Sequence, residues 1–174
     1  MTSRYTYDFL GEPTGDIYRR LLEAATRTCS SVLLVTRGHG TPTDSAMGVL
    51  ERLSHNLTAT EEVWAWPGTR LYRISERSRG ATLRTFRYSE QVAAILTSAA
   101  ASLYAWKEPD LPEDLALLRA PGNVWLGSVA HESDAWLELT DAEHSELTEV
   151  VPGLVELLAP PRTTGTEVPV QDDA

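Results

Sequence analysis

The apolar residues of this chain fall into short segments whose spacing alternates between that of helices and that of strands. The run Ser31–Thr36 is apolar through its centre and too short for a helix, which favours a buried strand. Before it, in Gly15–Thr28, apolar residues recur every three or four positions, as on one side of a helix. No stretch approaches the roughly 18 consecutive apolar residues of a membrane span. We therefore expect helices packed on a sheet.

The same reasoning extends along the rest of the chain. Further helices are expected from Asp44 through Leu57, from a Ser89 cap to Trp106, and from Thr140, where Glu143 three residues later gives the spacing of a capping box. Further strands are expected at Val63–Trp66, Leu71–Ile74, Thr82–Tyr88, Leu115–Arg119, Val124–Ala130 and Ala135–Leu139, the last three forming a meander. The predicted class is α+β, an antiparallel or mixed sheet of about six to seven strands covered by about four helices.

The length of 174 residues suits one domain, which we place at residues 1–158. Residues 159–174 offer little to bury and are expected to form a disordered acidic tail. Cys29 is the only cysteine, so no internal disulfide is possible. The first ten residues lack the basic start and apolar core of a signal peptide, and we expect a cytoplasmic protein.

Charge is unevenly distributed along the sequence. The formal net charge is −10, which argues against nucleic acid or an anionic membrane as the partner of the whole protein. Residues 1–87 carry a net charge of +3, however, and residues 88–174 a net charge of −13. An acidic half of this size would steer association with a cationic surface.

The most localised polar feature is a group of six arginines within eighteen residues: Arg70, Arg73, Arg77, Arg79, Arg84 and Arg87. One interpretation is a solvated hairpin whose guanidinium groups meet the acidic second half. The other is an anion-binding or partner-docking site, because a guanidinium group suits phosphate and carboxylate recognition. Trp64 and Trp66 lie just before the group, and tryptophan and arginine are enriched in binding hot spots. The candidate ligand-binding or partner-binding residues are therefore Arg70, Arg73, Arg84, Arg87, Trp64 and Trp66.

A second polar group, His131-Glu132-Ser133-Asp134, follows the strand Val124–Ala130. It lacks the second histidine of an H-E-x-x-H zinc helix, since Ala135 occupies that position. We expect a hairpin turn there, with no metal and no cofactor, and keep His131 and Glu132 as secondary candidates for chemistry. The connector Arg37-Gly38-His39-Gly40 matches neither a P-loop nor a dinucleotide fingerprint and is expected to be flexible.

Residues Leu103 to Leu139 resemble a segment of small uncharacterised bacterial proteins, some of which are labelled stage III sporulation protein AH. The resemblance rests on Pro-Glu-Asp-Leu at Pro112 to Leu115, a hairpin at Pro121 to Asn123, and Ser-Val-Ala-His-Glu at Ser128 to Glu132. It implies a bacterial protein, gives no catalytic residues, and draws attention to His131 and Glu132. The sporulation protein itself is membrane-anchored, whereas we expect no anchor here.

Three functional hypotheses follow from these patterns. The first is a protein-binding domain, such as an inhibitor or immunity-type partner of a basic toxin. The second is a domain that binds an anionic small molecule through the arginines of residues 70–87. The third is a hydrolase or transferase centred on His131 and Glu132, although the sequence favours a protein that is not an enzyme. The oligomeric state is left open.

Overall fold

The computed structural model describes residues 3–38 and 40–163. The helices are α1 (Gly15–Ala25), α2 (Asp44–Leu53), α3 (Glu90–Ala99) and α4 (Asp141–Val150). The strands are β1 (Tyr5–Asp8), β2 (Ser31–Thr36), β3 (Leu57–Val63), β4 (Ala65–Trp66), β5 (Thr69–Arg70), β6 (Ala81–Arg87), β7 (Glu113–Arg119), β8 (Asn123–Val129), β9 (Asp134–Leu139) and β10 (Arg162–Thr163). A 3-10 turn, η3 (Ala130–Glu132), joins β8 to β9.

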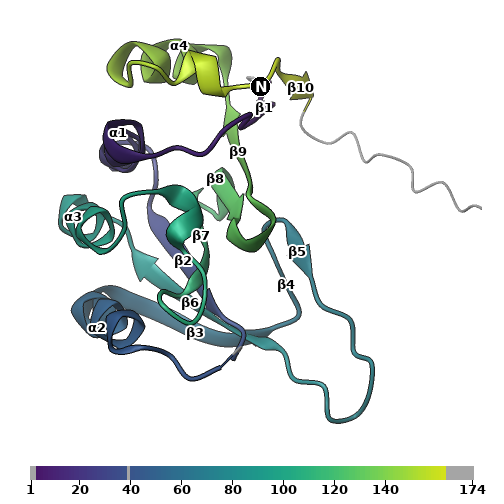
Figure 1. Ribbon diagram of the computed structural model, residues 1–174. Coiled ribbons are helices and arrows are strands. Elements are labelled where there is room, and N and C mark those ends of the chain that lie inside the picture. Colours follow the sequence, from purple (N-terminus) through teal and green to yellow (C-terminus); the bar gives the residue numbers. More distant parts are fainter. Residues whose placement is uncertain (1–2, 39, 164–174) are drawn as a thin grey trace, which may run out of the picture.

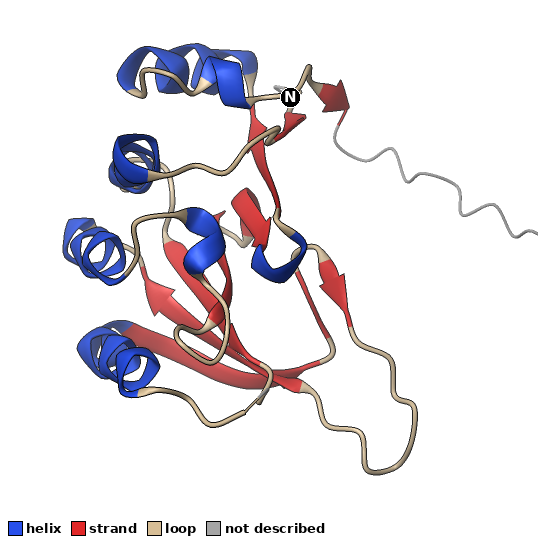
Figure 2. Ribbon diagram, viewed as in Figure 1, coloured by secondary structure: helices blue, strands red, loops and turns tan. Residues whose placement is uncertain are grey.

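Eight of these strands form one sheet in the order β10-β1-β9-β8-β7-β2-β6-β3, and all neighbouring strands are antiparallel. The four α-helices lie side by side on one face of this sheet, and the β4–β5 hairpin lies on the opposite side (Figures 1 and 2). The predicted α+β class is confirmed. Three of the sheet's strands, β1, β3 and β10, have no counterpart among the predicted ones.

The main core lies between the helices and the sheet, and Trp106, Tyr18 and Phe86 are its largest fully buried side chains. Trp106 satisfies its indole N–H by donating to the Tyr18 hydroxyl at 2.8 Å, so the aromatic packing leaves no polar group unpaired there. A smaller cluster of Val35, Trp66 and Ala81 lies under the β4–β5 hairpin. The sheet is thus covered on both faces where the hairpin sits.

Several local predictions are confirmed. The buried strand occupies Ser31–Thr36, and β7, β8 and β9 form the expected meander. Helix α4 begins after Thr140, whose side chain accepts from the backbone N–H of Glu143 while the Glu143 carboxylate accepts from the N–H of Thr140. This is the reciprocal pairing that the spacing predicts.

Other predictions are wrong. Leu71–Ile74 is not a strand but part of a loop between β5 and β6. The helix expected to reach Trp106 ends at Ala99, because the backbone of Ala100 is already extended. The segment from Leu57, expected to end a helix, instead forms β3, which pairs with β6 at the sheet edge.

The end of the described chain is paired to the sheet edge. Arg162 in β10 forms two hydrogen bonds with the Asp8 carboxylate in β1, at 2.7 and 2.8 Å. Residues 164–174 of the predicted tail lie outside the described residues, as does His39 of the predicted connector. Within the described residues, no helix combines the length and apolar character needed to cross a membrane.

Candidate functional site

The arginine-rich segment includes a loop that projects from the body of the protein. After the β4–β5 hairpin the chain runs outward through residues 71–80, here called the projecting loop, before returning as β6 (Figure 1). Tyr72 and Ile74 in this loop are 77% and 92% exposed. The Ser78 hydroxyl accepts hydrogen bonds from the backbone N–H groups of Ile74 and Ser75, at 3.1 and 3.0 Å, and so closes the turn at the tip. The projecting loop therefore holds two large apolar side chains in solvent, with Ile74 at the start of the hydrogen-bonded turn.

The arginines of this region are not neutralised by the acidic half of the chain. Arg70, Arg73, Arg77 and Arg79 form no ion pair with any residue in 3–38 or 40–163. The guanidinium group of Arg73 instead lies over the Trp64 ring, 5.0 Å from its centroid. The first interpretation of the arginine group, internal neutralisation, does not describe these four residues.

The predicted binding residues separate into three places. Trp64, Arg70 and Arg73 line one shallow concave surface at the base of the projecting loop. Arg84 lies in β6, where its Nη1 donates to the Thr36 hydroxyl at 2.8 Å, and Arg87 lies at the far end of β6, opposite Ser31. Of the predicted residues, only Trp64, Arg70 and Arg73 can therefore contact the same ligand or partner surface as the projecting loop.

Trp66, the remaining predicted residue, anchors the hairpin to the sheet. Its side chain is buried, and its Nε1 donates to Oδ2 of Asp114 at 2.8 Å. The hairpin turn contributes Gly68, whose φ of +80° favours glycine and whose added Cβ would lie 2.6 Å from a Val129 methyl group. Trp136 is as close to that position, at 2.7 Å. The Trp66 hydrogen bond and the close packing at Gly68 therefore fix the base of the projecting loop to the sheet.

Beneath this anchor lie two buried carboxylates, Glu113 and Asp114, at the start of β7. They are 4% and 1% exposed. Oδ1 of Asp114 accepts from the backbone N–H of Ala130 at 2.9 Å, and Nδ1 of His131 lies 3.9 Å from the same oxygen. Nε2 of His131 lies 3.6 Å from the Glu132 carboxylate. The structure thus brings the secondary candidates His131 and Glu132 next to an acid pair that the sequence analysis did not single out.

Positive charge near this pair comes from Arg37, at the end of β2. Its Nη1 lies 3.6 Å from Oε2 of Glu113, and its guanidinium carbon lies 5.9 Å from the Trp66 ring centroid. Oε2 of Glu113 accepts no hydrogen bond from any described residue, and neither does Nε of Arg37 donate one. Burial, with the neighbouring Asp114, raises the pKa of Glu113 above its ordinary value against the opposing effect of Arg37.

The cluster of Glu113, Asp114 and His131 combines hard carboxylate donors with a borderline imidazole donor. One imidazole nitrogen of His131 and one oxygen each of Glu113 and Asp114 lie within 4.8 Å of one another. Imidazole and carboxylate together are ligands of divalent transition-metal ions. The sequence signal that could have found the pair is the adjacency of Glu113 and Asp114 at the start of an otherwise apolar strand, where an acid needs a partner.

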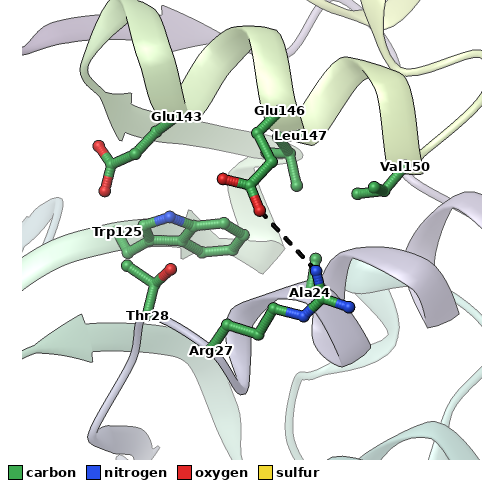
Figure 3. A pocket seen from close by; sticks show the side chains of 8 residues that line it. All are labelled: Ala24, Arg27, Thr28, Trp125, Glu143, Glu146, Leu147 and Val150. Carbon is green, nitrogen blue, oxygen red and sulfur yellow. Dashed lines mark ion pairs between the residues drawn. The ribbon is translucent and has the colours of Figure 1, made fainter.

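A further cavity lies between α1 and α4, and Figure 3 shows the indole of Trp125 beside it. Arg27 of the α1 end and Glu146 of α4 approach across it with an Nη1–Oε1 distance of 3.8 Å. It holds about 40 Å³, which suits a few water molecules rather than a ligand. This cavity is therefore not a candidate ligand site.

Comparison with known proteins gives no family for this chain. No protein-family model matches it, and neither a curated protein nor a solved structure matches it.

Proposed function

We propose that this chain is a protein-binding domain that docks through the projecting loop onto an acidic surface with an apolar pocket. The observation that carries the proposal is the exposure of Tyr72 and Ile74 on the arginine-rich projecting loop, whose turn is closed by Ser78. Full burial of an apolar side chain of this size contributes about 1.5–3 kcal/mol, which an isolated monomer forgoes. The two side chains are suited to fill a pocket on a partner.

The stiffness of the loop base supports this role. Binding costs less when the contacting segment is already ordered, because fewer conformations are lost on association. Trp66 ties the hairpin to Asp114, and Arg73 packs over Trp64 close to the exposed side chains. Aromatic and arginine side chains presented together in this way are typical of interface hot spots.

The charge of the loop supports an acidic contact surface on the partner. Residues 70–80 hold four arginines and one acid, Glu76, in a chain whose net charge is −10. The loop therefore presents a basic patch on an acidic protein, and the partner needs the complementary pattern at this contact. If the loop binds at the active site of the partner, the chain would act as an inhibitor or immunity-type protein.

A second candidate function, binding of an anionic small molecule, is favoured by one observation. Arg70 and Arg73 line the same concave surface as the Trp64 ring, so a phosphate or carboxylate could contact both guanidinium groups. The two candidates differ in their dependence on Ile74, since the concave surface of Arg70 and Arg73 is also lined by Tyr72 but not by Ile74.

The test is affinity capture from the native host with the full-length chain, comparing wild type with Tyr72→Ala plus Ile74→Ala. The matched control is Met47→Ala plus Leu10→Ala, which truncates two exposed apolar side chains elsewhere. We expect a protein that binds wild type and the control but not the loop variant. Equal capture by all three would overturn the proposal. Phosphate-induced NMR shifts at the Trp64 indole that need Arg73 would instead support the second candidate.

A further inference from the structure

The geometry points to a divalent transition-metal site, with Zn²⁺ as its best-suited ion, formed by Glu113, Asp114 and His131 beneath the β4–β5 hairpin. One donor atom from each residue lies within 4.8 Å of the other two. Zinc ligands at about 2.0–2.2 Å from the ion lie roughly 3.4 Å from one another in a tetrahedral site. Donor-atom displacements on the order of 1 Å, by side-chain rotation, would therefore bring the three ligands to zinc-binding distances. His131, the exposed member, is free to make that movement.

The buried side chain of Glu113 has one carboxylate oxygen that no described residue satisfies with a hydrogen bond. Its side chain is 6% exposed and its Oε2 receives no hydrogen bond from the described residues. Arg37 approaches this oxygen only to 3.6 Å, outside hydrogen-bond distance. A buried carboxylate oxygen without a donor is costly, and a metal ion supplies the missing electrophile.

Two hydrogen bonds hold the Asp114 carboxylate in one orientation and leave each of its oxygens able to bind a metal ion. Trp66 Nε1 donates to one carboxylate oxygen and the N–H of Ala130 to the other, at 2.8 and 2.9 Å. Each carboxylate oxygen has two lone pairs, so each keeps one for an ion. The backbone of Asp114 has a φ of +55°, a conformation that few non-glycine residues adopt and that is held here by these bonds.

The exposed Glu132 carboxylate lies near the second ring nitrogen of His131, just beyond hydrogen-bond distance in this structure. If Nδ1 of His131, which faces Asp114, binds the ion, its Nε2 faces Glu132 at 3.6 Å. A carboxylate that accepts the second N–H of a ligating histidine fixes the ring and raises its basicity. The His131 side chain is 37% exposed, which gives the ion a path from solvent.

The test is isothermal titration of untagged, metal-free, full-length protein with Zn²⁺, together with thermal melting. We expect one Zn²⁺ per chain and a raised melting temperature. His131→Ala should weaken binding at least tenfold, and Glu132→Gln by about 10-fold to 100-fold, as for outer-shell partners elsewhere. The matched control His55→Ala, which removes an exposed histidine in another turn, should bind as wild type does.

Three further measurements separate this site from adventitious binding. Glu113→Gln should lose binding, and Zn²⁺ should shift the Trp66 indole N–H resonance, which Trp66→Phe assigns. Mg²⁺ in excess should not displace Zn²⁺, because imidazole disfavours Mg²⁺. Folded wild-type protein that does not bind Zn²⁺ would overturn the proposal. Binding that His131→Ala leaves unchanged would overturn it as well.

Discussion

The indole N–H of Trp66 donates to the carboxylate of Asp114 at 2.8 Å across 48 positions of sequence. This bond joins the β4–β5 hairpin to the start of β7, on the face of the sheet that the helices leave uncovered. It therefore connects the projecting loop to the buried acid pair, the two candidate sites of the molecule.

We predict that Trp66→Phe destabilises the protein by about 1–3 kcal/mol, because it leaves a buried carboxylate oxygen without its donor. Urea unfolding measures the change. Trp64→Phe is the control, since Trp64 is half-buried and the structure gives its indole N–H no hydrogen bond within the described residues. Equal losses for the two variants would contradict the role given to the Trp66 hydrogen bond.

The turn of the hairpin gives a second prediction. Gly68→Ala places a Cβ 2.6 Å from Val129, and overpacking of this kind costs about 1–3 kcal/mol beyond the cost of the positive φ. Gly38→Ala is the matched control, because Gly38 has nearly the same φ, +79°, and nothing within 4 Å of an added Cβ. Thermal or urea unfolding should show the larger loss for Gly68→Ala. A loss no greater than that of Gly38→Ala would show that the hairpin is not tightly seated.

Acid sensitivity is predicted from Glu143. Burial raises the pKa of Glu143, but hydrogen bonds from the Thr140 backbone and from Arg119 outweigh it and hold the pKa below its ordinary value. A carboxyl group whose pKa is lowered by folding stabilises the protein above its unfolded pKa of about 4.3. That contribution is lost as the pH falls through the lower, folded pKa. The unfolding free energy should therefore decrease below about pH 4.5.

The variant Glu143→Gln tests this assignment. It should lower stability at pH 7 by about 1–3 kcal/mol, because Arg119 loses a charged partner in a largely buried place, and it should flatten the acid dependence. Glu149→Gln, on the exposed side of the same helix, should leave both unchanged. An acid profile that Glu143→Gln does not alter would assign the dependence to other carboxylates.

Cys29 is predicted to be unreactive in the folded protein. Burial raises the pKa of its thiol to about 12, so almost no thiolate is present at pH 8. Iodoacetamide labelling followed by mass spectrometry should be slow in buffer and complete in denaturant. Rapid labelling under native conditions would mean that the connection between α1 and β2 opens readily.

Sequence patterns predicted the elements whose residues interact locally. The capping box of Thr140 and Glu143 and the buried strand Ser31–Thr36 depend on spacing alone. Strand β3 was missed because its residues are mostly polar and exposed at the sheet edge, and so lack the alternation of a half-buried strand. Leu71–Ile74 has the composition of a strand, but no partner strand reaches it, and Tyr72 remains in solvent.

The candidate sites likewise divide into contacts between residues close in sequence, which were predicted, and contacts between distant residues, which were not. Trp64, Arg70 and Arg73 meet because they are close in sequence, and the sequence analysis selected all three. Glu113 and Asp114 meet His131 only because β7 and β8 are paired and η3 turns back toward β7. No spacing rule in a single sequence encodes that contact, so the proximity of the acid pair to His131 could not be predicted.

Strand β3 has a consequence for how copies of this chain behave in a crowded solution. It is seven residues long and has no neighbour on its outer side in the described sheet, so it could accept the edge of a second sheet. Glu61 and Glu62 are exposed on it, and pairing of two copies along this strand would place like charges near one another on both faces of the joined sheet. The charged edge strand thus disfavours edge-to-edge pairing between copies of this sheet.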